Sequence, residues 1–390
     1  MAGGPAPEAA GVVVISTTRQ RLLFLIPTLT GGGAERVIVT LLMHLDRARF
    51  DLALAVVDMR GAAYLHDIPH DVEFIDLQCT RVRDAVPKII RLIWNRRPHI
   101  VFSTLSHLNL ALAISRPLLP NNVRYVARET SIVSCTINSQ KHRAWRRWAY
   151  RRFYPRFDLL VCQSHYMRDD LVAHFAYPQG KTVVIHNPID IDRVRTLAGE
   201  SASAADSCAA ATGMPTGPVV RLVAAGRMVH VKGFDLLLEA MARSGNATLR
   251  LTLLGEGPLR PRLEAMAVGL GLAPRVHFAG YLRNPYPCIA QADAFVLSSR
   301  YEGFPNVALD ALACMTPVIA IRSPGGAMEL LEGVPGCVVT ANPTADGLAD
   351  VLRDLSWLRR LDADAAARYA VQKITGQYAN ALHQLRGANR

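Results

Sequence analysis

Long apolar segments are missing from this sequence. No stretch reaches the roughly 18 uninterrupted apolar residues that a membrane-spanning helix needs, although 50% of the 390 residues are hydrophobic. Residues 1–11 carry no basic segment ahead of an apolar one. We therefore interpret the short apolar run that follows Arg21 as a buried strand, not as a signal peptide, and expect a cytoplasmic protein.

Paired cysteines and lysines are also scarce. The seven cysteines stand singly, without the CxxC spacing of a structural zinc site, which predicts free thiols in a reducing compartment. The formal charge of +12 comes mostly from arginine. Because an arginine-rich composition can reflect a GC-rich genome, the total charge says little about partners.

One local cluster of charge is more informative. Residues 141–156, KHRAWRRWAYRRFYPR, interleave basic and aromatic side chains. This mixture suits the headgroup region of an anionic membrane, and it would also suit nucleic acid. A solvated helix whose aromatic residues pack on the core gives the same pattern. Of the two partners we favour the membrane, and we predict no binding of nucleic acid. The inner membrane surface or the acceptor would then contact Arg146, Arg147, Arg151 and Arg152.

Short apolar runs alternate with helix-length segments through most of the chain. The run 21–27 leads into a glycine turn and then a helix from about Ala34, and the alternation restarts after residue 218. Runs that are apolar throughout are typical of parallel strands buried on both faces. We predict an α/β protein with two Rossmann-like, doubly wound parallel sheets that meet across a cleft.

The composition also suggests boundaries. Residues 197–218 are small, polar and rich in glycine and proline, as in a linker. The predicted segments are a flexible N-terminus 1–20, an acceptor domain 21–196, the linker 197–218, a donor domain 219–365 and a C-terminal helix 366–390 that packs back on the first domain.

Two basic residues follow the first strand of the second half. In GRMVHVKG, Arg227 comes directly after the expected strand and Lys232 precedes a helix. A helix N-terminus supplies free N–H groups and partial positive charge, and the two side chains neutralise the remaining negative charge of a diphosphate. We predict a diphosphate site here.

Two carboxylates follow a later strand. In EGFPNVALD, Glu302 ends the strand, Asn306 is expected to cap a helix, and Asp310 lies within that helix. Carboxylates accept hydrogen bonds from paired hydroxyls, so sugar and ribose are natural ligands.

These segments resemble the donor-binding signature of the retaining family-4 glycosyltransferases of GT-B fold, in which a GR…K pair and a GxGP turn precede a Glu-Gly-Phe motif and a second carboxylate. The resemblance extends from about residue 21 to residue 340 and includes GGGAERVIVTLL (31–42), VCQSHYMRDDL (161–171), VIHNPID (184–190), LLGEGPLRPRLEAMAVGLGL (253–272) and SPGGAMELL (323–331).

The resemblance implies roles for the matching residues. Arg227 and Lys232 would bind the donor diphosphate and stabilise the leaving group, Glu302 would contact sugar hydroxyls, and Asp310 would hold the ribose. Further donor contacts would come from the first-half loop Gly31, Gly32 and Gly33, from the amides of Gly303 and Phe304, and from the base-reading backbone of Tyr281 and Leu282.

Two positions depart from the family pattern. Asp310 stands where the family has glutamate, so the carboxylate is one methylene shorter. In VARETS (126–131), Arg128 and Glu129 stand where several members carry a histidine near the sugar. We expect one of the two to contact the donor sugar or the acceptor. The nearest histidines are His107 and His186, of which His186 would support the interdomain region.

The reaction type follows from the same residues. No DxD-like pair of carboxylates follows a strand, and Asp169 and Asp170 fall in a helical pattern. We predict a metal-independent, retaining transfer without a cofactor, from a UDP-sugar or GDP-mannose to a lipid-linked oligosaccharide for the cell surface. A non-catalytic nucleotide-sugar-binding subunit and a 2-epimerase of the same fold are the alternatives.

Overall fold

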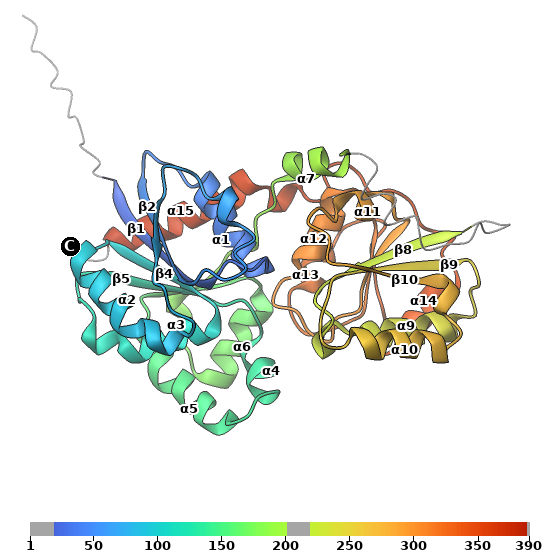
Figure 1. Cartoon of the computed structure of the whole chain (residues 1–390), viewed down its shortest axis with the longest axis horizontal. Helices are drawn as coiled ribbons and strands as arrows, with labels where there is room; N and C mark the ends of the chain where they lie inside the picture. Colours follow the sequence, from blue (N-terminus) through green and yellow to red (C-terminus); the bar gives the residue numbers. More distant parts are fainter. Residues whose placement is uncertain (1–18, 201–218, 388–390) are drawn as a thin grey trace, which may run out of the picture.

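The computed structural model describes residues 19–200 and 219–387. Figure 1 shows two α/β bodies side by side, one blue to green and the other yellow to orange. Most of the expected flexible N-terminus and of the expected linker, residues 1–18 and 201–218, lies outside the described residues.

The first sheet has strands buried on both faces. Leu23 and Leu25 belong to one hydrophobic cluster, whereas Leu22 and Phe24 belong to another. This explains why the strand reads as a continuous apolar run. The strands are β1 (Gln20–Thr28), β2 (Phe50–Asp58), β3 (Glu73–Asp76), β4 (Ile100–Thr104), β5 (Arg124–Arg128), β6 (Leu159–Cys162) and β7 (Thr182–Val184). They are parallel and ordered β3-β2-β1-β4-β5-β6-β7.

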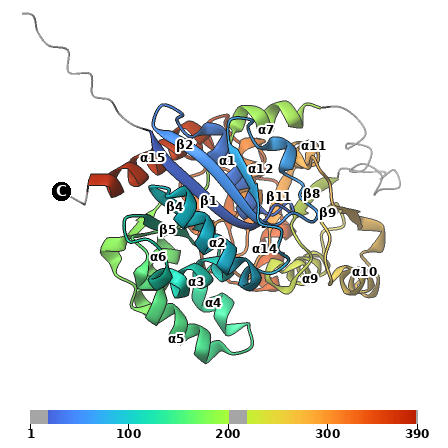
Figure 2. The same ribbon diagram turned by 60° about the vertical axis from the view of Figure 1, so that its left-hand side comes forward.

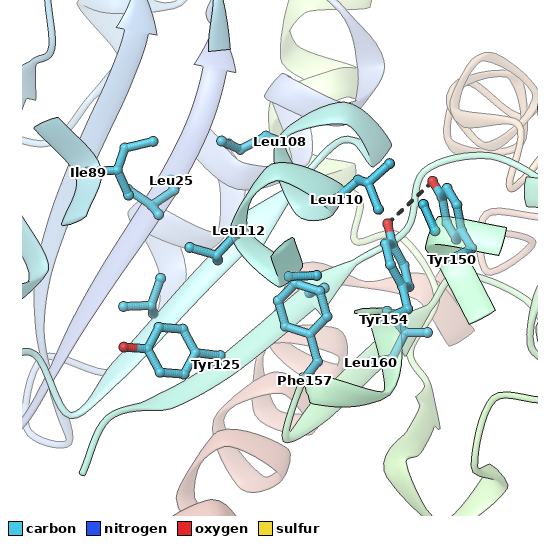
Figure 3. Packing of buried hydrophobic residues seen from close by; sticks show 14 of the residues in the cluster. Leu25, Ile89, Leu108, Leu110, Leu112, Tyr125, Tyr150, Tyr154, Phe157 and Leu160 are labelled. Carbon is cyan, nitrogen blue, oxygen red and sulfur yellow. Dashed lines mark hydrogen bonds between the residues drawn. The ribbon is translucent and has the colours of Figure 1, made fainter. Parts of the chain in front are cut away.

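Six α-helices between residues 33 and 175 accompany this sheet. They are α1 (Gly33–His44), α2 (Val82–Arg96), α3 (Ser106–Ser115), α4 (Val133–Asn138), α5 (Arg143–Phe153) and α6 (His165–Phe175). The next helix, α7 (Ile191–Ala198), packs on the second half, where Val194 belongs to the same hydrophobic cluster as Ile289 and Leu309. Figure 3 shows part of the core beneath α2 and α3, where Leu25, Ile89 and Leu108 pack near Tyr125 and Phe157.

The second sheet repeats the plan with six strands. They are β8 (Val220–Ala225), β9 (Leu249–Leu254), β10 (Val276–Gly280), β11 (Ala294–Leu297), β12 (Val318–Ala320) and β13 (Val338–Val339), ordered β10-β9-β8-β11-β12-β13. Its α-helices are α9 (Phe234–Ser244), α10 (Arg260–Gly269), α11 (Tyr286–Gln291), α12 (Asn306–Ala313), α13 (Ala327–Leu331) and α14 (Ala345–Arg353). The predicted α/β class with two parallel, doubly wound sheets is confirmed.

The last helix, α15 (Val371–Gly387), returns to the first half. Ile374, Tyr378 and Leu382 belong to the same cluster as Leu22 and Phe24 of β1, and Figure 2 shows α15 beside β1 and β2. The segments that cross between the halves are joined by a parallel bridge between residues 189 and 370.

The cysteines only partly follow the expectation of free thiols. Within the described ranges five are free, namely Cys79, Cys135, Cys162, Cys314 and Cys337. Cys288 is disulfide-bonded, so the prediction is wrong at that position. Sequence spacing does not reveal which cysteines a fold brings within bonding distance.

Candidate active site

The turn after β8 carries both predicted cations. Gly226 has φ of +151° and Gly233 has φ of +63°, values that favour glycine. A Cβ on Gly233 would lie 2.0 Å from the carbonyl oxygen of Ser298, so this turn packs directly against the end of β11. Arg227 is exposed, and no hydrogen bond or ion pair joins its guanidinium to another described side chain.

Lys232 meets Glu302, although the two belong to separate motifs. Lys232 Nζ lies 2.6 Å from Glu302 Oε1, and Ser299 Oγ donates to the same oxygen at 2.7 Å. The contact forms because β8 and β11 are neighbours. The strand order reverses between them, which is the usual ligand-binding position in open α/β sheets.

The turn after Glu302 abuts the first half. A Cβ on Gly303 would lie 2.9 Å from the carbonyl oxygen of Thr130. Phe304 is only 5% exposed, with its ring centroid 5.2 Å from that of His186 and 5.4 Å from that of Tyr369. The Phe304 side chain therefore packs at the interface, which leaves its backbone amide as the group available for a donor contact.

Asn306 corrects the expected helix cap. Helix α12 begins at Asn306, with Pro305 in the capping position and no side-chain cap. The Asn306 side chain instead donates to the carbonyl oxygen of Gly33 at 3.0 Å and accepts from Asn187 Nδ2 at 2.6 Å. A residue predicted to serve its own helix thus joins the two halves.

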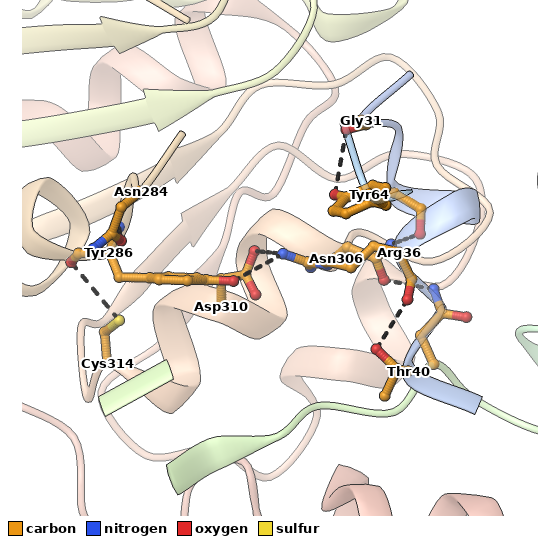
Figure 4. A network of polar contacts seen from close by, with 11 residues as sticks. Gly31, Arg36, Thr40, Tyr64, Asn284, Tyr286, Asn306, Asp310 and Cys314 are labelled. Carbon is orange, nitrogen blue, oxygen red and sulfur yellow. Dashed lines mark hydrogen bonds and ion pairs between the residues drawn. The ribbon is translucent and has the colours of Figure 1, made fainter. Parts of the chain in front are cut away.

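Asp310 also contacts the first half, one turn further along α12. It is 2% exposed, and its Oδ2 lies 2.9 Å from Arg36 Nη1 of α1 (Figure 4). Arg36 Nη1 also lies 3.2 Å from Tyr286 Oη. Burial raises the pKa of Asp310, and the positive charge and hydrogen bond of Arg36 partly oppose that rise. Nothing in the sequence pattern pointed to Arg36.

The glycine loop after β1 faces the second half. Gly31 has φ of +102°, and a Cβ there would lie 3.4 Å from Tyr281 Oη. A Cβ on Gly33 would lie 2.6 Å from Asn306 Nδ2. Tyr281 itself is 61% exposed, and Leu282 packs partly buried against the core of the second half. The structure thus brings the predicted loop close to Tyr281.

Glu35 holds the same loop and was not predicted. This buried carboxylate accepts from the backbone N–H of Gly32 and from Thr28 Oγ1, with Thr30 Oγ1 at 3.3 Å. Its place in the first turn of α1, three residues after Gly32, is that of the glutamate in a capping box. That spacing could have identified it.

Arg128 is fully buried, at 0% exposure. Its Nη2 donates to Asn187 Oδ1 at 2.6 Å and its Nε donates to Tyr378 Oη of α15 at 3.2 Å. Its Nη1 has no hydrogen-bond partner among the residues that the structure describes. Arg128 therefore links β5 to α15 and, through Asn187, to Asn306.

Glu129 is equally buried. Ser106 Oγ donates to its carboxylate at 2.8 Å and Asn109 Nδ2 at 3.3 Å, and the hydroxyl of Tyr154 also donates to it. Burial raises the pKa of Glu129, and these hydrogen bonds, which favour the ionised carboxylate, oppose part of that rise. All of these partners lie within the first half.

The arginine- and aromatic-rich segment 141–156 contains α5 and the turn that follows it. Some of its aromatic side chains face the core and others face the surface. Tyr150 and Tyr154 are buried, as the core-packing interpretation predicts for part of the segment. Trp145 and Trp148 are 52% and 53% exposed. No helix in the described ranges is both long and apolar enough to cross a bilayer.

The four arginines of α5 differ in exposure. Arg151 and Arg152 are exposed, whereas Arg146 and Arg147 are partly buried. The Arg147 guanidinium lies 6.0 Å from the ring centroid of Phe175. Side chains three, four and seven residues apart share one side of a helix, so Arg152 shares the exposed side with both tryptophans.

The two candidate histidines have different surroundings. Burial, with the nearby charge of Arg146, lowers the pKa of His107. His186 Nε2 lies 3.4 Å from Glu329 Oε2 of α13, and the Glu329 carboxylate also accepts from the backbone N–H groups of His165 and Tyr166 at 3.0 Å each. Glu329, which the sequence did not single out, joins α13 to the N-terminus of α6.

No group of three or more histidine, cysteine, aspartate or glutamate residues in the described parts of the chain is placed to hold a metal ion. Asp169 and Asp170 lie in α6, as predicted.

Comparisons with known proteins match both halves. Residues 31–193 match the model described as Glycosyltransferase Family 4, and residues 219–356 match the model described as Glycosyl transferases group 1. A Campylobacter jejuni protein named N-acetylgalactosamine-N,N'-diacetylbacillosaminyl-diphospho-undecaprenol 4-alpha-N-acetylgalactosaminyltransferase is 27% identical over 350 residues, which are 86% of this chain and 91% of that protein.

Two further matches are more distant or shorter. The Rhizobium meliloti lipopolysaccharide core biosynthesis glycosyltransferase LpsE is 38% identical over 138 residues, which are 35% of this chain and 39% of that protein. Anabaena Alr3699/HepE, solved in complex with UDP-glucose, superposes with a TM-score of 0.75 at 21% identity, covering 94% of this chain and all of that one. This last likeness is one of fold.

Proposed function

Because this chain belongs to the glycosyltransferases of GT-B fold, with a Family 4 half followed by a group 1 half, we propose that it transfers a hexosyl group from a UDP-sugar to a lipid-linked oligosaccharide. The transfer retains the anomeric configuration and needs no metal ion. The observation that carries this proposal is the contact of Lys232 with Glu302 beside the exposed Arg227.

In this proposal the two cations bind the donor diphosphate. Lys232 Nζ is paired with Glu302 Oε1 at 2.6 Å. A bound diphosphate attracts the ammonium group and frees the carboxylate for sugar hydroxyls. Arg227 has no hydrogen-bond or ion-pair partner within residues 19–200 and 219–387 to give up, so its charge is available to the phosphates. The glycine loop 31–33 and the amides of Gly303 and Phe304 complete the donor contacts.

The reaction breaks the bond between the anomeric carbon and the β-phosphate oxygen. Charge develops on that oxygen as the bond breaks, and positive groups already in place stabilise it without reorganisation. The acceptor hydroxyl attacks the same side of the sugar, and its proton passes to the departing phosphate oxygen. Closing the two halves excludes the water that would otherwise hydrolyse the donor.

The choice of substrates rests on the relatives. The Campylobacter protein is named for a diphospho-undecaprenol substrate, which supports a lipid-linked acceptor. The Anabaena structure contains UDP-glucose, which supports a UDP-sugar over GDP-mannose. The exposed Trp145 and Trp148, beside Arg152, support peripheral contact of α5 with an anionic membrane at its cytoplasmic face.

The test is a transfer assay. Purified enzyme is incubated with UDP-glucose, UDP-galactose, their N-acetylated forms or GDP-mannose, together with polyprenyl-diphosphate oligosaccharides in detergent. EDTA is present throughout. We expect one UDP-sugar to give a product, and the NMR coupling constant of the transferred sugar's anomeric proton should show the same anomeric configuration as in the donor. An inverted product contradicts retention, and activity lost in EDTA and restored by Mg²⁺ contradicts metal independence. Donor binding without transfer to any acceptor would favour the non-catalytic subunit.

A further inference from the structure

A carboxylate of the second half binds the start of a helix in the first half. Glu329, in α13, accepts hydrogen bonds from the backbone N–H groups of His165 and Tyr166 at 3.0 Å each. These are the first two residues of α6, and Figure 1 shows α6 and α13 on the facing sides of the two bodies. The first N–H groups of a helix have no acceptor within that helix. Glu329 therefore supplies from across the interface an acceptor that α6 lacks.

The charges at this contact favour it. His186 Nε2 lies 3.4 Å from Glu329 Oε2, and the two side chains keep only 24% and 22% of their surface exposed. Burial alone would raise the pKa of Glu329, but the hydrogen bonds from His186 and from the two N–H groups outweigh it and hold the pKa below its usual range. The partial positive charge of a helix N-terminus also attracts a carboxylate. An ionised carboxylate thus joins the halves at this point.

The segment that leads into α13 is bound to the turn 302–304, which we call the donor turn. The N–H of Gly326 donates to the carbonyl oxygens of Glu302 and Gly303 at 3.2 and 3.1 Å, and the N–H of Glu302 donates to the carbonyl oxygen of Pro324 at 3.1 Å. Gly325 has φ of +116°, and a Cβ there would lie 1.6 Å from the carbonyl oxygen of Glu302, so only glycine permits this approach. The segment is therefore fixed to the donor turn.

The backbone of Glu329 is held as well. Its carbonyl oxygen accepts from Tyr369 Oη at 3.2 Å and from Arg368 Nη2 at 3.0 Å, both in the segment that crosses between the halves. The ring of Tyr369 lies 5.4 Å from the ring of His186 and also 5.4 Å from that of Phe304. Glu329, the crossing segment and the donor turn thus form one packed unit against the first half.

We propose that Glu329 is a positioning residue for the sugar transfer, which holds the donor turn at a fixed place against the first half by binding the N-terminus of α6. The inference rests on the proposed function, in which the donor turn binds the sugar. The carboxylate of Glu329 bonds to the protein, so its effect on the reaction passes through the backbone of Glu302 and Gly303.

This role predicts a separation between binding and transfer. Transfer requires the reacting atoms to lie about 3–3.5 Å apart in the correct orientation, and a displacement of about 1 Å can cost 10²-fold in rate. The sugar is held by the second half and the acceptor by the first, so a loosened contact between them lowers the rate of transfer. Arg227 and Lys232, which bind the diphosphate in the proposed function, stay in place, so nucleotide affinity should be retained.

The test compares the full-length wild type with Glu329→Ala and Glu329→Gln. Glutamine keeps the size of the side chain and one acceptor oxygen, so it remains informative if the alanine variant is less stable. Glu332→Ala is the matched control, because Glu332 is an exposed glutamate that ends the same helix. Mass spectrometry follows amide hydrogen exchange in peptides from α6, and calorimetry gives the Kd of UDP. Steady-state kinetics give kcat with the UDP-sugar and the polyprenyl-diphosphate acceptor that react in the transfer assay.

In Glu329→Ala we expect the N-terminal amides of α6 to exchange at least about tenfold faster, because each loses a hydrogen bond to a charged group. The kcat should fall at least about tenfold, while the Kd of UDP should change less than about threefold. Glu329→Gln should lie between the wild type and the alanine variant in both exchange and kcat. Glu332→Ala should match the wild type in all three measurements.

Three results overturn the positioning role while the wild type remains an active transferase. Unchanged exchange in α6 would mean that Glu329 does not hold this helix in solution. Faster exchange with an unchanged kcat would make the contact a structural one only. A loss of UDP affinity equal to the loss of kcat would assign Glu329 to donor binding. If the wild type transfers no sugar, the proposed function fails and the positioning role fails with it, and titration of the wild type with UDP identifies this case separately.

Discussion

Charged residues that follow strands have opposite surroundings in the two halves. In the second half, Lys232 and Glu302 keep 22% and 13% of their side chains exposed, and among the described residues their side chains bond only to each other and to Ser299 Oγ. In the first half, Arg128 and Glu129 at the end of β5 have no exposed surface. A charge at a strand end therefore locates the edge of a sheet but does not tell whether the side chain serves a ligand or the fold.

The largest effect that tests this difference between the halves is expected from removing the Lys232 side chain. Lys232→Ala should lower kcat/KM by about 10²- to 10³-fold, as loss of a group that stabilises transition-state charge does, and Lys232→Arg should recover part of the loss. Steady-state kinetics measure both. Arg221→Ala is the control, since Arg221 lies in β8, ahead of Lys232, and forms an exposed pair with Asp293. A change of only a few-fold in Lys232→Ala would place Lys232 outside the reaction.

Removing Arg128 should affect the fold instead. Arg128→Met removes the buried donor to Asn187 Oδ1 and to Tyr378 Oη, so we expect a loss of about 2–4 kcal/mol in the free energy of unfolding. Urea denaturation measures this loss, and titration of the folded variant with UDP measures the affinity. An unchanged stability with lost UDP or acceptor binding would instead support the sequence-based prediction that Arg128 contacts a substrate.

The buried Glu129 should make stability depend on pH. Because burial raises its pKa in the folded state, the folded protein binds this proton more tightly than the unfolded chain does. Its contribution to stability is therefore fully present below the unfolded pKa and is lost as pH rises through the folded pKa. Glu129→Gln should flatten the unfolding free energy measured from pH 4 to pH 8. Parallel curves for wild type and variant would contradict this.

The smallest expected effects concern α5. The exposed pair Arg151 and Arg152, changed together to glutamine, should weaken binding to anionic liposomes by about 1 kcal/mol per charge, whereas the partly buried Arg146 and Arg147 should contribute less. Sedimentation with liposomes at low salt compares the two double variants. Equal effects would mean that only total charge matters, and absence of binding by the wild type would remove the membrane proposal.

Local patterns predicted the strands, the two sheets and the places of Lys232 and Glu302, because burial on both faces and glycine turns produce recognisable patterns in neighbouring residues. The interface between the halves produces no such local pattern. Arg36, Glu329 and the actual role of Asn306 depend on contacts between residues more than 100 positions apart, and these exist only once both halves are folded. The burial of Arg128 likewise depends on Tyr378, which α15 brings back from the end of the chain.

The donor site is tested most directly by thermal stabilisation with UDP, GDP, ADP and their sugar conjugates, on the wild type and on Arg227→Ala. A nucleotide present at about 100 times its Kd should stabilise the folded wild type by roughly 2.7 kcal/mol. We predict this stabilisation with UDP and its conjugates and its loss in Arg227→Ala. No shift with any nucleotide, or the same shift in both proteins, would contradict the assignment of Arg227 and Lys232 to the diphosphate.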